Sequence, residues 1–347
     1  SLINPNLTWE KSTTKNLGFD FTFLQSRLTF TADIFERKVT DILIPGGKDY
    51  PALIGDDDLP FENAGILKTT GFELQAKWSD KLANGFRYSV GVALSDDKAK
   101  VVSYPSNPTN KIGDGVLYKG YTVGDIWGYV TGGILQEGDF DGVGANGKPL
   151  YHGPYFKGGQ AYPGYIWYQD LDHDGVITTG LNTVDDPGDR KVIGNNAPLY
   201  RYNITANFQY KGFDLDLMFQ GVGKRDYWLS STSSYWGNGA GSWEVYNNSW
   251  TPERTDAKFP MYGSGTGSYP QTGYLLDASY IKLKQVILGY TFPRALINKI
   301  GLEKLRLNLA AYNLFTISDM PKYYDADYLS DAYPPKRTFS VGIQVGF

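Results

Sequence analysis

The sequence predicts an all-β protein, an antiparallel transmembrane β-barrel, and three observations support this fold class. The chain ends on a strictly alternating segment in which Phe339, Val341 and Ile343 share one face, while Ser340 and Gly342 share the other. The same period of two recurs in about nine segments, and it gives each strand one apolar and one polar face. The gaps between these segments run short, long, short, long, as the turns and loops of a membrane barrel do.

Each predicted strand is placed by its alternating apolar residues. In chain order these segments are 17–23, 28–34, 72–78, 86–94, 204–210, 213–219, 286–292, 305–311 and 339–347. The polar residues between the apolar ones would face a water-filled lumen. The charged residues that we assign to the lumen are Asp20, Glu73, Lys77, Arg87, Asp214, Asp216, Lys282 and Arg306.

Connection lengths separate a barrel from a soluble β-sandwich, which also buries one face of every strand. The long connections cover about 40–67, 101–199, 221–278 and 313–336. The other connections between successive strands are brief. Transmembrane barrels have brief periplasmic turns and long outside loops. We therefore predict that residues 1–347 are the C-terminal portion of a transmembrane barrel with four long extracellular loops.

Composition agrees with a barrel and excludes several other classes. No segment approaches the roughly 18 consecutive apolar residues of a membrane helix. Because the chain has no Cys, it can form neither disulfides nor thiolate-bound metal sites. Its net charge of -4 is spread over both signs and gives no basic patch of the kind that binds nucleic acid. About nine strands would leave two open edges, which cannot lie in hydrocarbon, so we expect upstream sequence to supply the rest of the wall.

Several short motifs, in order along the whole chain, resemble the SusC/RagA family. They are NPNLTWEK at 4–11, NAGI at 63–66 with TGFEL at 70–74, PG at 163–164 through DLDHDG at 170–175, VIGN at 192–195, FQGVG at 219–223, WTPE at 250–253, DASYIKL at 277–283 and NLF at 313–315. The resemblance covers nearly all of this chain but only about the C-terminal third of a family member.

The resemblance implies a TonB-dependent outer-membrane transporter of Bacteroidetes, with a barrel of roughly 22 strands around an N-terminal plug. Such importers take up glycans (oligosaccharides) or, in some members, peptides. They pair with a SusD-like surface lipoprotein that closes over the barrel as a lid. The plug, the TonB box and the first strands are expected outside this chain, and with them the contact to TonB.

Aromatic side chains concentrate in two of the predicted extracellular loops and are the candidate contacts for substrate or lid. Aromatic faces suit the C–H faces of sugar rings, and Trp and Tyr are also enriched at protein interfaces. The alternative is that these rings pack the loops together or form an interfacial belt. The candidates are Trp127, Tyr129, Trp167, Tyr168, Trp228, Tyr235, Trp236 and Trp243.

The segment DLDHDG begins like a calcium loop, in which Asp170, Asp172 and Asp174 would converge on a hard cation. The twelfth position is Leu181 instead of the bidentate Glu of an EF-hand. A structural calcium ion is one interpretation, and Asp side chains that cap turns are the other. The carboxylates that would have to complete the shell are Asp185, Asp186 or Asp189.

No catalytic residues and no other cofactor are expected. The only histidines, His152 and His173, lie in the loop 101–199 outside any nucleophile context. Besides the importer, which the motifs favour, two further classes stay open. A secreted carbohydrate-binding β-protein would need no detergent, and a passive porin would lack both lid and plug.

Overall fold

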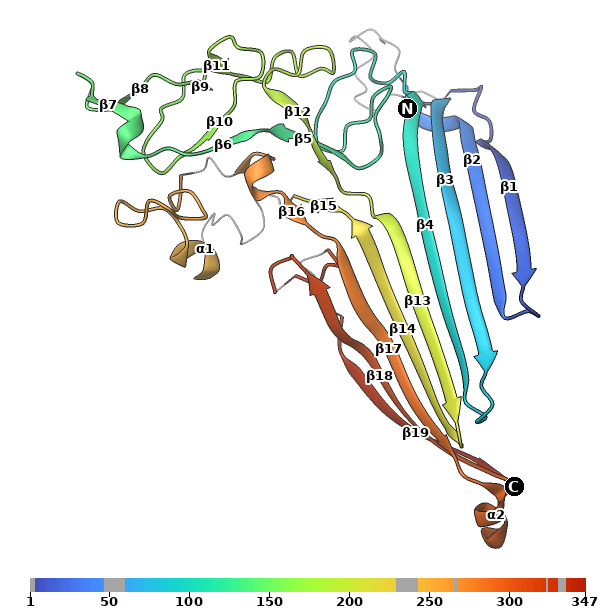
Figure 1. The fold of residues 1–347 in the computed structure, drawn as a ribbon. Coiled ribbons are helices and arrows are strands. Elements are labelled where there is room, and N and C mark those ends of the chain that lie inside the picture. The colour runs from blue at the N-terminus through green and yellow to red at the C-terminus, as the bar shows by residue number, and fades with distance from the viewer. Residues whose placement is uncertain (1–3, 47–59, 229–242, 265–267, 323, 330–334) are drawn as a thin grey trace.

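The computed structural model describes residues 4–46, 60–228, 243–264, 268–322, 324–329 and 335–347. Within them, nine antiparallel strands form one large curved sheet in the order β1-β2-β3-β4-β13-β14-β17-β18-β19 (Figure 1). The strands are β1 (Lys11–Phe23), β2 (Leu28–Pro45), β3 (Phe61–Lys81), β4 (Arg87–Ser103), β13 (Leu199–Tyr210), β14 (Phe213–Lys224), β17 (Tyr280–Thr291), β18 (Lys304–Ser318) and β19 (Thr338–Gly346). The predicted fold class, part of an antiparallel barrel wall, is confirmed.

Short connections lie at one end of this sheet and long connections at the other (Figure 1). Lys211 and Gly212 alone join β13 to β14, with φ of 47° and 88°. Positive φ at both central residues makes a two-residue turn whose twist matches that of the flanking strands. At the same end, α2 (Arg294–Ile297) and η5 (Asn298–Ile300) connect β17 to β18.

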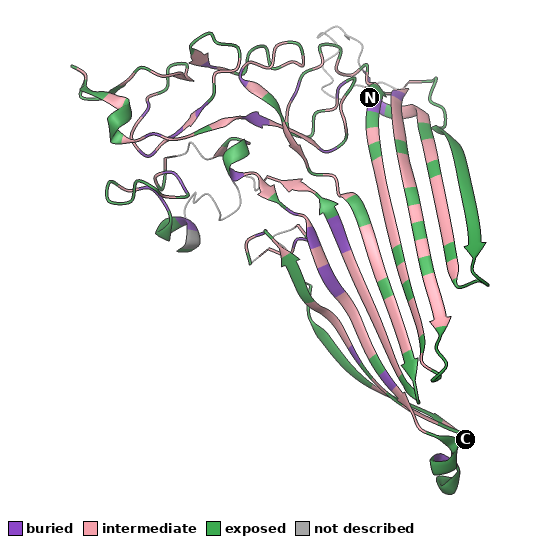
Figure 2. Cartoon of the chain, viewed as in Figure 1, coloured by how far each residue is buried: buried purple, intermediate pink, exposed green. Residues whose placement is uncertain are grey.

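The two faces of the sheet differ as the alternation predicted. On the outer face, large apolar side chains stay exposed, among them Phe19 at 50%, Val92 at 43% and Leu309 at 55%. Along the strands exposed and half-buried residues predominate (Figure 2). Strand register places all eight charged residues of the predicted lumenal set on the opposite face. A wall that is apolar outside and polar inside suits lipid on one side and water on the other.

The apolar band on the outer face ends at a definite level. On β2 the outward residue after Ile34 is Glu36, and on β3 the outward residue beyond Phe72 is Thr70, the Cα partner of Glu36. Glu36 also forms an ion pair with Lys68 at 2.8 Å. This level marks the side of the band that lies away from the short turns.

Two strands continue well beyond the band. β2 has 18 residues and β3 has 21, whereas a membrane crossing needs about 9–11. Part of the loop expected at 40–67 is therefore strand, with bulges near Ile42. Outside hydrocarbon neither face has to be apolar, so the alternation fades although backbone pairing continues.

The two longest connections fold into a unit of short elements beyond the long-loop end of the sheet (Figure 1). Its pairs are β5–β12, β6–β10, β7–β8, β9–β11 and β15–β16. Its core joins residues of both connections, including Tyr129 and Ile166 from one and Phe259 and Tyr274 from the other. The elements are β5 (Asp125–Tyr129), β6 (Thr131–Ile134), η2 (Glu137–Asp139), β7 (Phe140–Val143), β8 (Pro149–Tyr151), β9 (Tyr155–Phe156), β10 (Ile166–Tyr168), β11 (Val176–Ile177), β12 (Arg190–Asn195), β15 (Asp226–Tyr227), α1 (Trp243–Asn247), η4 (Thr272–Tyr274) and β16 (Leu276–Asp277). Among the described residues, no helix is both long and apolar enough to cross a membrane.

Candidate functional site

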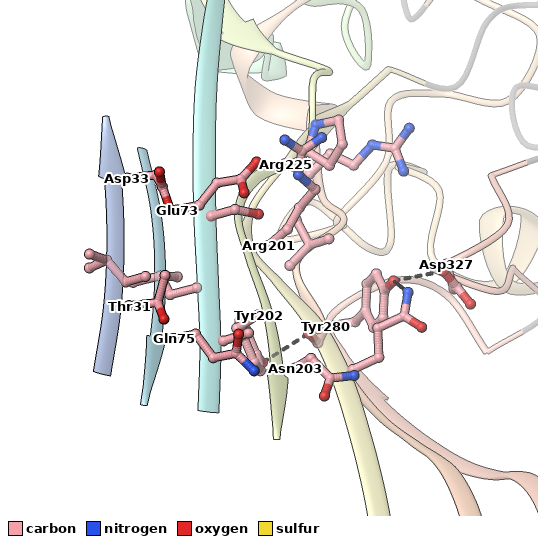
Figure 3. A pocket seen from close by; sticks show the side chains of 18 residues that line it. Thr31, Asp33, Glu73, Gln75, Arg201, Tyr202, Asn203, Arg225, Tyr280 and Asp327 are labelled. Carbon is pink, nitrogen blue, oxygen red and sulfur yellow. Dashed lines mark hydrogen bonds between the residues drawn. The ribbon is translucent and has the colours of Figure 1, made fainter. Parts of the chain in front are cut away.

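The polar face of the sheet presents its side chains in rows that cross the strands. One row, level with the end of the apolar band, contains Asp33, Glu73, Ser95, Arg201, Val222 and Tyr280. The next row toward the short turns contains Thr31, Gln75, Ala93, Asn203, Gln220 and Lys282. Residues of both rows line a pocket of about 610 Å³, here called the lumenal pocket (Figure 3).

One side of the lumenal pocket is acidic. Asp33 and Glu73 are Cα partners on β2 and β3, so their side chains leave the sheet next to each other. Asp33 accepts a hydrogen bond from Asn16 at 3.0 Å. In the described part of the chain, neither carboxylate forms an ion pair. Like charges directly opposite each other destabilise a strand pair, so sheet stability does not account for this arrangement.

The other side of the lumenal pocket is basic. Arg201 on β13 forms an ion pair with Asp97. The Nε of Arg225 donates to the Asn196 carbonyl at 2.9 Å, and burial lowers the pKa of Arg225. Figure 3 shows both guanidinium groups across the pocket from Asp33 and Glu73. Two strand spacings separate Glu73 from Arg201, or about 10 Å.

An ion cluster around the buried Lys282 lies beyond Tyr280, at the far side of the pocket. Lys282 is 1% exposed, and its Nζ donates to both oxygens of Asp325 at 2.8 and 2.9 Å and to Asp327 at 3.3 Å. Lys284 donates to Asp327 at 2.6 Å, and the Tyr280 hydroxyl donates to it at 2.7 Å. Burial opposes the charge of Asp327, but the hydrogen bonds from Lys284 and Tyr280 outweigh it and hold its pKa at about 2.

A second lumenal ion pair lies nearer the short turns. Arg306 on β18 donates to Asp214 on β14 at 2.6 Å, across the intervening strand β17. The residue of β17 beneath this contact is Gly289, where a Cβ would lie 2.4 Å from Arg306 and 2.5 Å from Asp214. The missing side chain therefore lets the ion pair bridge over β17.

Three of the predicted aromatic contact residues belong to the core of the loop unit. Tyr129 is 3% exposed and Tyr168 is 1% exposed, with ring centroids 4.9 Å apart. Burial raises the pKa of the Tyr168 phenol. Trp228 packs against the same core. Contact of these rings with substrate or lid stays a prediction, and burial argues against it for Tyr129 and Tyr168.

The other aromatic candidates differ in their surroundings. Trp127 is half-buried and donates from Nε1 to the Tyr118 hydroxyl at 2.9 Å, and Trp167 is half-buried over Gly132. Trp243 is 75% exposed and stacks on Tyr246, with centroids 5.6 Å apart. Trp243 therefore has the most open ring among the described candidates. Tyr235 and Trp236 lie outside the described residues.

The acidic turn brings its three carboxylates together. Asp170, Asp172 and Asp174 each offer an oxygen atom, and these atoms lie within 4.8 Å of one another. Asp170 also accepts backbone hydrogen bonds, including one from Gly175 at 2.8 Å. Asp189 is fully buried and accepts two backbone hydrogen bonds, at 2.8 and 2.7 Å, which fix the turn. The geometry suits a hard cation as well as turn capping, so bound calcium stays a prediction.

The histidines offer no catalytic arrangement in the described part of the chain. His152 lies 2.9 Å from Asp141, and both side chains are more than 70% exposed, at 72% and 75%. His173 occupies the acidic turn with a φ of 61°. Exposure to water leaves neither imidazole the fixed partner geometry that general acid–base catalysis uses.

Sequence reasoning did not single out several groups that shape the lumenal pocket. Asp33 alternates with the outward apolar residues of its strand, and this alternation could have predicted that its side chain faces the lumen. Arg201 and Arg225 lie at the ends of strands, where alternation gives no guidance. Asp325 and Asp327 lie in a loop, and only the fold reveals their contact with Lys282.

Comparison with known families decides which family this is. The family model described as TonB dependent receptor-like, beta-barrel, matches residues 1–314. The chain belongs to the TonB-dependent receptor β-barrel family. Proteins of this family and of the SusC/RagA type are outer-membrane proteins, so the wall lies in the bacterial outer membrane.

Relatives agree with the resemblance drawn from the motifs. TonB-dependent receptor P3 of Formosa agariphila is 28% identical over 371 residues, which cover 99% of this chain and 35% of that protein. TonB-dependent receptor SusC of Bacteroides thetaiotaomicron is 27% identical over 366 residues, which cover 99% of this chain and 32% of that protein. The chain thus spans about a third of the length of these relatives.

Solved structures show the same fold. The RagAB peptide importer in its open-open state matches with a TM-score of 0.73 at 21% identity, over 99% of this chain and 35% of the other. The RagAB peptide transporter gives a TM-score of 0.71 at 19% identity, over 99% of this chain and 36% of the other. The predicted TonB-dependent receptor family is confirmed by the family match, and these structures show that the chain has the fold of the RagAB importer.

Proposed function

We propose that this chain forms part of an importer that carries oligosaccharides across the outer membrane in a TonB-dependent manner. The observation that carries the proposal is a family match over residues 1–314 on a wall whose polar face holds the lumenal pocket. The apolar outer face meets lipid. A SusD-like surface lipoprotein would cover the extracellular side, and TonB would act through sequence outside this chain.

Purification of the full-length protein from native outer membranes tests this proposal. We expect a surface lipoprotein in stoichiometric amount and a bound oligosaccharide, both identified by mass spectrometry. Recovery without any partner or ligand would support a porin. Recovery in the soluble fraction would support a secreted binding protein.

A second candidate function, peptide import, is favoured by the divided charge of the lumenal pocket. A short peptide carries an amine at one end and a carboxylate at the other. At about 3.3–3.6 Å per residue, three extended residues span roughly 10 Å, the separation of Glu73 and Arg201 across two strand spacings. A neutral oligosaccharide can form hydrogen bonds with these groups, but it has no charge to pair with either side.

The same purification separates the two candidates when it is repeated with Glu73→Gln. For a peptide importer, we expect fewer co-purified peptides, because the variant removes one of the two carboxylates facing the ligand amine. Glu36→Gln is the matched control, since Glu36 lies on the outer face and contacts Lys68. Equal peptide recovery from both variants, or recovery of oligosaccharide alone, would rule out the peptide assignment.

A further inference from the structure

The connection between β18 and β19 turns back onto the lumenal face of the wall. Residues 324–329, here called the inward segment, carry Ala326, which is 1% exposed and belongs to a buried cluster with Val222 and Tyr280. Leu329 packs against this cluster, and its carbonyl accepts a hydrogen bond from the Tyr227 hydroxyl at 3.4 Å. The inward segment is thus packed against strand residues that face the lumen.

The polar anchor of the inward segment is Lys282. Its ammonium group is covered by the protein, and it donates to Asp325 and Asp327, which lie 43 and 45 residues further along the chain. A bulge in β17 adds Lys284 between Leu283 and Gln285. Lys284 then also reaches Asp327. Two ammonium groups face two carboxylates, so the cluster is electrically neutral.

The anchor also shapes the lumenal pocket. Asp327 is one of its lining residues, as is Tyr280, whose hydroxyl binds Asp327. Figure 3 shows Asp327 beside Tyr280 on the side away from Asp33. The far wall of the pocket is therefore built partly from the inward segment and not from strands alone.

We propose that Lys282 is the positioning residue that holds the inward segment inside the barrel and so makes it a fixed wall of the lumenal pocket. The ligand role of this pocket rests on the proposed function, but the position of the segment does not. Without Lys282, one ammonium group would face two carboxylates whose side chains are only 20% exposed. An unpaired charge that is mostly covered by protein is less stable than the intact pair, so the segment would move outward to hydrate it.

A cysteine reporter tests the proposal, because this chain contains no Cys. In the full-length protein, freed of any other cysteine, Ala326→Cys is reacted with a maleimide–polyethylene glycol reagent in isolated outer membranes. We expect slow labelling in the parent and at least about tenfold faster labelling with Lys282→Met, because local opening then becomes easier. Lys282→Arg should restore slow labelling, since Arg keeps the charge and the donors.

Three controls isolate the role of Lys282. Lys77→Met removes an exposed lumenal lysine that forms no ion pair among the described residues, and it should leave labelling unchanged. Tyr328→Cys, at a position 46% exposed, should label quickly in every background. Amide hydrogen exchange of residues 324–329 in the Lys282→Met protein, without the reporter, checks that the cysteine itself does not open the segment.

The labelling and exchange results test the role of Lys282 and do not depend on the proposed function. Slow labelling and unchanged exchange in a folded Lys282→Met barrel would overturn it, as would equal acceleration by Lys77→Met. Neither readout uses a substrate. If the purification experiment contradicts the proposed function, the role of Lys282 is unaffected. If labelling contradicts the role of Lys282, the proposed function is unaffected.

Discussion

Leu217→Lys would place a charge on the outer face of the wall near the middle of its apolar band. Leu217 lies on β14 between Ala206 and Val286, its partners on the two neighbouring strands. It follows Phe213, the first residue of β14, by four positions. At about 3.3 Å per residue and a tilt of about 40°, this is roughly 10 Å above the short turns, in a band about 25 Å tall.

The expected cost of Leu217→Lys is about 2–4 kcal/mol, the penalty for Lys at the bilayer midplane. Met218→Lys makes the same chemical change one residue further along, at a position paired with Thr205 and Gln285 on the lumenal face. Its ammonium group stays in water, so we expect a cost below about 1 kcal/mol. The face on which the lysine lies therefore accounts for a difference of roughly 1–4 kcal/mol.

Guanidinium unfolding of the full-length protein in phospholipid vesicles, followed by Trp fluorescence, measures this difference. We expect the unfolding midpoint to fall clearly for Leu217→Lys and little for Met218→Lys. Equal loss from the two variants, or a larger loss from Met218→Lys, would refute the assignment of the faces.

Three further predictions concern polar contacts. Gly289→Ala adds a methyl group 2.4 Å from Arg306 and 2.5 Å from Asp214, so the ion pair must open at a cost of about 1–2 kcal/mol in the same unfolding assay; an unchanged midpoint would show that the pair contributes nothing. Calcium should raise the thermal midpoint of the protein, and Asp172→Ala should abolish the rise; no response to saturating calcium would end the idea of a metal site. The folded pKa of Asp327, about 2, lies below the ordinary 3.8, so its stabilising contribution is complete above about pH 4 and is lost as pH falls toward 2. The protection factors of the amides at 324–329, which correct exchange rates for their intrinsic pH dependence, should thus stay constant between about pH 8 and 5 and fall below about pH 3, and a fall near pH 6 would implicate another group.

The wall was predictable because lipid and water act on each strand independently. Leu217 must be apolar and Asp216 polar whatever the rest of the chain does, so a two-residue period reveals both faces. The short turns follow equally local rules, as the Lys211–Gly212 turn shows. The strand extensions to Pro45 and from Phe61 escaped prediction because no lipid constrains them.

The site was less predictable because it depends on contacts between distant segments. The Tyr168 hydroxyl accepts a hydrogen bond from Gln271, 103 residues away, and this packing decides that Tyr168 is buried. Lys282 meets Asp325 across 43 residues. Composition showed that the loops are rich in aromatic and acidic residues, but it does not show which of them pack on each other.

The level at which the outer face changes from Ile34 to Glu36 sets the electrical surroundings of the lumenal pocket. Asp33 and Glu73 lie just inside this level, next to Ile34 and Phe72, the last apolar outward residues, so they are close to the aqueous edge of the membrane. Ions in the medium then screen them, with a Debye length of about 8 Å at physiological ionic strength. Attraction of a charged solute to this part of the wall should weaken as the salt concentration rises. The hydrophobic contact of the apolar band with lipid should not weaken.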